Sequence, residues 1–186
     1  MKSTLLTMTA SLCGLALLVG AALAGVNILT EKPIAEAQAE ARRQAIAAVL
    51  PEFDNNPSEE AIVTPDGLTL FPATKNGEEV GTAVETYSDN GFSGRFTILA
   101  GFDRDGRVTG FRVLSHSETP GLGAKMGEWF SAEGTSHDVT GHTQPFTLKN
   151  HGGDIDAITG ATITSQAFME ALNRAAEACA NKNSEP

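Results

Sequence analysis

The sequence has little cysteine and little positive charge, and each shortage excludes a class of protein. Its two cysteines are Cys13, in an apolar N-terminal stretch, and Cys179, near the C-terminus, so there is neither a Cys-x-x-Cys pair nor a disulfide framework. Thirteen Lys and Arg stand against 23 Asp and Glu, for a formal net charge of −10. Because nucleic-acid-binding proteins gather Lys and Arg on one face, we expect no nucleic-acid partner.

Clustered metal ligands and catalytic side chains are also missing. The four histidines are His116, His137, His142 and His151. Because they lack paired ligand spacing, no metal site is expected. Ser117 is adjacent to His116 in the chain, but adjacency does not create a nucleophile and base arrangement. We therefore predict no catalytic residue, and hydrolysis is disfavoured.

One long apolar run is the clearest feature that is present. No charged residue occurs between Ser3 and Thr30, and the run is long enough to cross about 30 Å of hydrocarbon as a helix. A cleaved signal peptide is the alternative, because Ala22-Leu23-Ala24 matches a cleavage pattern and Lys2 supplies a positive charge. We favour a retained single-pass anchor in the cytoplasmic membrane, since the uncharged run continues through Leu29. Lys2 places the N-terminus in the cytoplasm and the acidic remainder outside it, in the periplasm.

The pattern along the chain predicts three regions. Residues 1–30 form the membrane anchor, residues 31–60 a connecting helix and linker, and residues 61–186 one folded domain. Pro33 suits the first turn of the connecting helix, and Pro51 ends its helical spacing.

Short β-like runs dominate the chain from residue 61 onward. They are LTLF, VGTAVETY, RFTILAGFD and RVTGFRVLSH. The Asp105-Gly106 step between the last two is a strong hairpin signal.

Helices complete the predicted domain. We expect a short helix within residues 121–130, one or two strands within 139–149 and a final helix over 165–182. In the final helix, one face carries Phe168, Leu172, Ala175 and Cys179, a stripe that would pack on the sheet. Antiparallel strands with these helices predict an α+β fold.

Near the C-terminus, DAITGATITS (156–165) places two threonines around a Gly-Ala step. Gly160 can adopt backbone angles closed to other residues and Ala161 adds almost no bulk, so a ligand can approach this loop closely. Thr162 lies just before the final helix, where free N–H groups and the helix dipole favour a phosphate. The alternative is that Thr162 or Thr164 only caps the helix.

Together with SETPGLGA (117–124), this segment resembles the covalent-FMN domain found in the G subunit of Rnf electron-transport complexes and the C subunit of sodium-pumping NADH:quinone oxidoreductases. In that family, a flavin transferase recognises an Asp followed by a small hydroxyl residue, Gly, Ala and an acceptor Thr. These places are filled by Asp156, Thr159, Gly160, Ala161 and Thr162. The resemblance implies that a separate transferase links FMN to Thr162 through a phosphoester bond.

The resemblance implies further contacts with the flavin. The loop against the isoalloxazine ring would contain Glu118, Thr119, Gly121, Leu122 and Gly123. Lys149 would lie near the flavin, where a positive charge stabilises the reduced, anionic form. Without the resemblance, the loop is a Pro-Gly turn and Lys149 is a surface lysine. Trp129 and Phe130 belong either to the core or to the rim of the flavin pocket.

The function implied by the resemblance is that of an electron-carrying flavoprotein subunit in a membrane-bound complex. That complex would exchange electrons between ferredoxin and NAD while moving Na⁺ or H⁺. The partners would be its other subunits, the flavin transferase and the lipid bilayer, with no independent activity for this chain. The short chain and the HSETPGLG stretch favour the Rnf subunit over the quinone-reductase subunit. Two alternatives stay open: a stand-alone anchored flavin reductase, and a non-catalytic exported module whose threonines only cap a helix.

Overall fold

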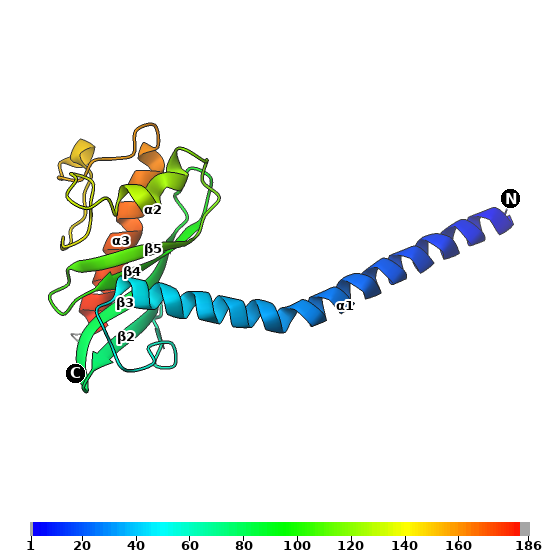
Figure 1. Cartoon of the computed structure of the whole chain (residues 1–186). Helices are drawn as coiled ribbons and strands as arrows, with labels where there is room; N and C mark the ends of the chain where they lie inside the picture. Colours follow the sequence, from blue (N-terminus) through cyan, green and yellow to red (C-terminus); the bar gives the residue numbers. More distant parts are fainter. Residues whose placement is uncertain (1, 183–186) are drawn as a thin grey trace. The chain divides into compact units, whose positions relative to one another are not determined.

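The computed structural model describes residues 2–182, and the chain divides between Arg42 and Arg43 into two compact units. Figure 1 shows the elements in chain order. They are α1 (Lys2–Val49), β1 (Ile62–Val63), β2 (Thr69–Lys75), β3 (Glu78–Ser88), β4 (Phe96–Phe102), β5 (Val108–Ser115), η1 (Gly123–Lys125), α2 (Met126–Trp129), η2 (Lys149–His151) and α3 (Thr162–Lys182). The predicted α+β class is confirmed.

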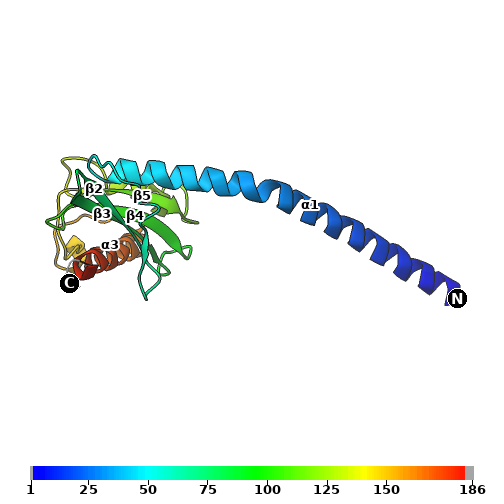
Figure 2. The ribbon, with the colours of Figure 1, turned by 90° about the horizontal axis from the view of Figure 1, so that it is seen from below.

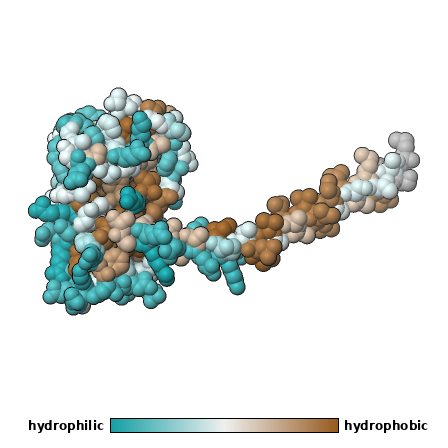
Figure 3. Space-filling model, in the orientation of Figure 1, coloured by the Kyte–Doolittle hydropathy of each residue, from teal (hydrophilic) through white to brown (hydrophobic). Residues whose placement is uncertain are grey.

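Helix α1 runs without a break through Pro33. The prediction of a separate connecting helix that begins near Pro33 is therefore wrong. A proline removes one hydrogen bond from the helical ladder, and the Ala-, Glu- and Gln-rich sequence after it favours the helix enough to continue. Within residues 2–182, α1 is the one helix long and apolar enough to cross a membrane. Its large apolar side chains from Leu6 to Ile34 are exposed, and Figure 3 shows a long brown stretch along it.

A five-stranded antiparallel sheet forms the centre of the second unit. The strands lie in the order β1-β2-β3-β4-β5, so each strand pairs with its neighbour in the sequence. The predicted hairpin between β4 and β5 is present, and the Asp103 carboxylate accepts hydrogen bonds from the N–H groups of Asp105 and Arg107. Gly106 has a φ of 75° there, a value that favours glycine.

Both faces of the sheet are covered, as Figure 2 shows. Helix α3 packs on β3 and β4, and the predicted stripe on its inner face is buried. Residues 46–50, which belong to this same unit, cover part of the other face, where they pack with Phe71 of β2 and Leu99 of β4. The last turn of α1 lies close to β4. Gly101 faces the Val49 carbonyl, and a Cβ atom at this position would have no room.

The segment expected to be a linker is fastened to the sheet. Asp54 donates its backbone N–H to the Thr74 carbonyl at 2.9 Å, and the Asn55 side chain accepts from the Thr74 N–H at 2.9 Å. The Asn55 amide also donates to the Pro72 carbonyl at 3.0 Å. These bonds occupy backbone groups along the edge region of β2 and give the segment a fixed course.

The strands predicted within residues 139–149 do not form. Only an isolated bridge joins Leu148 to Ile155 in the described chain. Pro145 has no N–H to give to a ladder, and the backbone of Phe146 is bound instead by the side chain of Asn173. The Asn173 amide accepts from the Phe146 N–H and donates to its carbonyl, both at 2.8 Å. A single side chain on α3 thus takes the place of a neighbouring strand.

Candidate functional site

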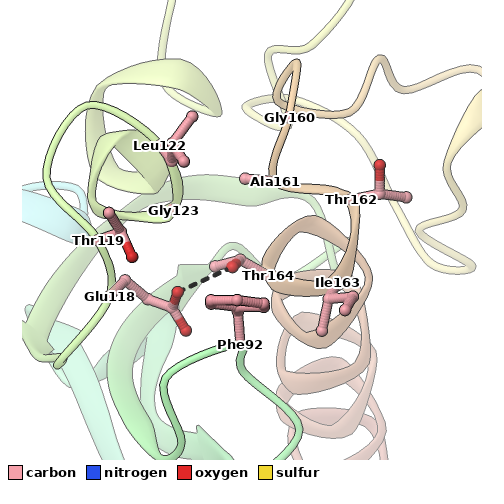
Figure 4. Close-up of a pocket in the computed structure, with 10 residues that line it drawn as sticks. All are labelled: Phe92, Glu118, Thr119, Leu122, Gly123, Gly160, Ala161, Thr162, Ile163 and Thr164. Atoms are coloured by element: carbon pink, nitrogen blue, oxygen red, sulfur yellow. Dashed lines mark hydrogen bonds between the residues drawn. The ribbon is translucent and has the colours of Figure 1, made fainter.

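Three segments that are distant in the sequence enclose one cavity of about 330 Å³ at the N-terminal end of α3. They are the β3–β4 loop, the loop over residues 118–123, and the Gly160–Thr164 segment that starts α3. Figure 4 shows the residues around it. The lining consists of Phe92, Glu118, Thr119, Leu122, Gly123, Gly160, Ala161, Thr162, Ile163 and Thr164. The volume lies within the usual range for a small-molecule site.

Glu118 joins the three segments from beneath the cavity. Its side chain is buried, with 4% of the residue exposed. One carboxylate oxygen accepts from the Ser93 N–H at 3.1 Å, and the other accepts from the Thr164 hydroxyl at 3.0 Å. A buried carboxylate needs such donors, so Glu118 fixes the β3–β4 loop against the first turn of α3.

Two glycines make room for this carboxylate. A Cβ atom at Gly91 or at Gly123 would lie 2.6 Å from a Glu118 carboxylate oxygen. Side chains at these positions would displace Glu118 and its bonds. The close approach of the backbone therefore explains the glycines that flank the site.

Thr162 is the first residue of α3. The helix begins three residues earlier than its predicted start, so Thr162 lies inside the first turn and not before it. Its side chain is exposed and makes no hydrogen bond to another residue of the described chain. The first N–H groups of a helix lack intrahelical partners and carry positive potential, so a phosphate at Thr162 would meet a favourable field.

The loop before Thr162 is held at the helix and open at its tip. The Ile158 N–H donates to the Ser165 hydroxyl at 2.9 Å, and that hydroxyl donates to the Ala161 carbonyl at 2.9 Å. Ser165, which the sequence did not single out, is thus the side chain that secures this turn. Gly160 has a φ of 78°, and a Cβ atom there would lie 3.3 Å from the Leu122 side chain.

Asp156 and Lys149 form an ion pair behind this loop. Lys149 Nζ lies 2.7 Å from Asp156 Oδ2, and the Ser136 hydroxyl donates to the same oxygen. The hydrogen bond from Lys149, followed by that from Ser136, holds the pKa of the Asp156 carboxyl below its ordinary value. Lys149 does not line the cavity.

The predicted site residues therefore fall into two groups. The cavity brings together Glu118, Thr119, Leu122, Gly123, Gly160, Ala161 and Thr162, whereas Gly121, Lys149, Asp156 and Thr159 lie outside its lining. Sequence reasoning missed Phe92, Ile163 and Thr164. The one available signal was an aromatic residue between Gly91 and Gly94, at Phe92, in the stretch between two predicted strands.

Trp129 and Phe130 do not line the cavity. Phe130 is fully buried and stacks on Phe168 with ring centroids 4.5 Å apart, so it belongs to the core. Trp129 is partly buried and stacks on His137 at 4.0 Å. In the described part of the chain, no group of three or more His, Cys, Asp or Glu side chains is placed to hold a metal ion.

Comparison with known proteins identifies the family. The family model of the FMN-binding domain matches residues 91–177, a stretch that includes most of the β3–β4 loop, the 118–123 loop and most of α3. The G subunit of the ion-translocating oxidoreductase complex from Photorhabdus laumondii is 35% identical over 164 residues, which are 81% of this chain and 78% of that protein. The G subunit from Aliivibrio fischeri is 35% identical over 92% of this chain and 90% of its own length.

The chain belongs to the G-subunit family of ion-translocating oxidoreductase complexes.

A similar solved structure is the C subunit of the Na⁺-translocating NADH-quinone reductase from Parabacteroides distasonis. It has a TM-score of 0.45 and 21% identity, over 67% of each chain. The names of the relatives confirm the expected preference for the G subunit. In this G-subunit protein, the cavity and its threonine lie within the matched FMN-binding domain.

Proposed function

We propose that this G-subunit protein carries FMN on Thr162 and passes electrons within an ion-translocating oxidoreductase complex. The observation that carries the proposal is the position of Thr162. This residue begins α3, and its free hydroxyl lies at the edge of a cavity inside the FMN-binding domain. The chain is one component of the redox complex, and FMN, when bound, supplies its one- and two-electron chemistry.

The residues around the cavity fit an isoalloxazine ring. Phe92, Leu122 and Ile163 line it, and they are respectively 68%, 42% and 55% exposed, so each of these large apolar side chains leaves a substantial part of its surface uncovered by protein. Burying them against a flat aromatic ring removes apolar surface from water, which stabilises the complex. These side chains therefore bind and orient the ring.

The polar part of the cavity favours a covalent link over retention by charge. None of the residues that line it in the described chain is Lys or Arg, and the carboxylate of Glu118 is already occupied by Ser93 and Thr164. The α3 N-terminus supplies only partial positive charge. A phosphoester bond to Thr162, made by a separate flavin transferase, would keep FMN in place without a basic pocket.

We further propose that α1 stays in the chain as a single-pass anchor in the cytoplasmic membrane. The N-terminus would lie in the cytoplasm and the FMN domain in the periplasm, where it would contact the other subunits of an Rnf-type complex. The complex would connect electron transfer between ferredoxin and NAD to the movement of Na⁺ or H⁺. The support is the apolar length of α1 and the membership of the chain in the G-subunit family.

Intact-mass analysis tests the cofactor and the anchor together. Full-length protein from native membranes is compared with Thr162→Ala, made in the same host. We expect the wild-type mass to exceed the sequence mass by one FMN less one water and to retain residues 1–30, while Thr162→Ala shows the bare chain. Wild-type protein without the added mass contradicts the covalent proposal, and a chain shortened near Ala24 contradicts the anchor.

A further inference from the structure

Asp156 begins the threonine motif, and three neighbouring segments hold its polar groups. Its N–H donates to the Ser136 carbonyl at 3.0 Å, and its carbonyl accepts from the Trp129 indole at 3.1 Å. Its Oδ2 accepts from Lys149 at 2.7 Å and from the Ser136 hydroxyl. The residue is therefore engaged by the chain's own donors and acceptors, although 38% of its side chain is exposed.

The other end of the motif is fixed as well, and only its tip is free. Ser165 binds both Ile158 and Ala161, and the Ala161 N–H donates to the Ile158 carbonyl at 3.0 Å. The three residues at the tip of the loop are exposed to solvent: Thr159, Gly160 and Thr162. A modifying enzyme that reads the folded domain thus meets the tip of the loop, with the Asp156 pairing behind it.

We propose that Asp156, Lys149 and Ser136 act in flavin attachment as positioning residues that hold the motif loop in the shape the transferase reads. The inference rests on the proposed attachment of FMN to Thr162. Lys149 then acts on the motif through Asp156 and not on the isoalloxazine ring. This role accounts for a lysine that lies outside the cavity lining and is neutralised by an ion pair.

The step that these residues assist is a phosphoryl transfer. The Thr162 oxygen forms a bond to the phosphorus of an activated donor, a phosphoanhydride of FMN, and the anhydride bond to the leaving phosphate ester breaks. The Thr162 proton leaves to solvent or to a base of the transferase, and no electron is exchanged. A displacement of this kind depends on how the attacking oxygen is placed, so a shift of about 1 Å slows it by up to about a hundredfold.

Removing Lys149 separates this role from a direct one. If Asp156 holds the loop, loss of its ion pair loosens the motif and slows attachment. If the transferase itself binds the Asp156 carboxylate, loss of Lys149 frees that carboxylate, and attachment continues at the same rate or faster. The two roles therefore predict different outcomes for the same substitution.

The experiment follows FMN loading of the full-length chain in membranes, with the transferase limiting, by intact mass over time. Lys149→Met and Ser136→Ala test the pairing, and Lys149→Arg keeps the charge and a donor. Lys75→Met is the matched control, because Lys75 pairs with Glu52 at 2.8 Å and its side chain is 44% exposed, against 2.7 Å and 50% for Lys149. We expect loading about tenfold slower for Lys149→Met and slower for Ser136→Ala. Lys149→Arg and Lys75→Met should load like the wild type.

A second readout separates the inference from simple instability and from a role at the flavin. The midpoint potential of the loaded fraction of Lys149→Met should equal that of the wild type, and its thermal midpoint should fall no further than that of Lys75→Met. Wild-type loading rates in both Lys149→Met and Ser136→Ala overturn the inference alone, as does a shifted potential with normal loading. A wild-type chain that never gains FMN overturns the proposed function and this inference with it.

Discussion

Phe92 is a large apolar side chain that lines the same cavity as Thr162 and that the fold leaves mostly exposed. The β3–β4 loop that carries it is held by Glu118 through the Ser93 N–H, so its position is set by this hydrogen bond and not by packing of the ring itself. Figure 4 shows Phe92, Leu122 and Ile163 around the same cavity although they come from three different segments. An apolar lining of this kind suits an aromatic ligand.

Phe92→Ala should expose the flavin without unfolding the protein. Because the ring is largely in water, its loss changes the free energy of unfolding by no more than about 0.5 kcal/mol. With FMN attached, quenching of flavin fluorescence by iodide should increase relative to the wild type. Val63→Ala, at an exposed apolar residue of β1, serves as the control. Equal quenching in Phe92→Ala and the wild type would show that Phe92 does not cover the ring.

Gly160→Ala should impair FMN attachment more than stability alone explains. At a φ of 78° a Cβ atom costs about 1 kcal/mol or more, and here it also presses on Leu122 at 3.3 Å. Gly106→Ala is matched in strain, with a φ of 75°, but meets open space in the β4–β5 turn. Similar melting temperatures with reduced FMN loading only in Gly160→Ala are expected. Equal loading in the two variants refutes a special role for Gly160.

At the scale of whole elements, β2 to β5 and α3 could be predicted from the sequence, whereas the structure of residues 139–149 could not. Alternation and the Asp-Gly turn mark β2 to β5, and helical spacing marks the inner face of α3, because both patterns depend on neighbours in the sequence. Residues 139–149 contain apolar positions of the same kind. The backbone of Phe146 in this stretch is bound by the side chain of Asn173 on α3. No local sequence pattern predicts a contact between residues 27 positions apart.

Asn173→Ala tests how much this side chain contributes to the placement of the segment. The substitution leaves the N–H and the carbonyl of Phe146 without partners, and a buried polar group left unpaired costs about 1–3 kcal/mol. We expect a loss of that size in chemical denaturation. Gln166→Ala, at an exposed position of the same helix, should change stability by less than about 0.5 kcal/mol. If both variants unfold at the same denaturant concentration, Asn173 does not organise the segment.

The same limit applies to the site. The motif from Asp156 to Thr162 and the 118–123 loop were identifiable because each is a short stretch of particular residues. Phe92 and Ser165 were not. The loop that carries Phe92 is held by the bond from the Ser93 N–H to Glu118, and Ser165 acts by accepting a bond from the Ile158 N–H. Glu118 is likewise buried because three segments come together around it, and the sequence of any one segment does not predict this contact.

At the scale of the whole molecule, several exposed carboxylates have pKa values lowered by bonded cations. Hydrogen bonds from Lys75, Arg95 and Lys149 hold the pKa values of Glu52, Asp89 and Asp156 below the ordinary 4.5, 3.8 and 3.8, respectively. The folded state thus keeps these groups charged where the unfolded state binds protons. Their contribution to stability is present above the ordinary pKa values and is lost as pH falls below them.

The melting temperature should therefore decrease as pH falls from about 6 to about 3. A triple variant, Glu52→Gln with Asp89→Asn and Asp156→Asn, lacks these carboxylates, so its melting temperature should depend less on pH. High salt screens exposed charges, so about 1 M NaCl should reduce the pH dependence of the wild type. Calorimetry across this pH range measures both effects. Parallel curves for the triple variant and the wild type would mean that other groups control the acid response.

The central claim concerns one bond at Thr162, and peptide mapping tests it most directly. Trypsin cleaves after Lys149 and Arg174, so residues 150–174 form one peptide from full-length protein taken from native membranes. Fragmentation of this peptide separates Thr162 from Thr159, Thr164 and Ser165. We predict that the added mass of FMN less one water lies on Thr162. A peptide that is unmodified, or modified at another hydroxyl, contradicts the account.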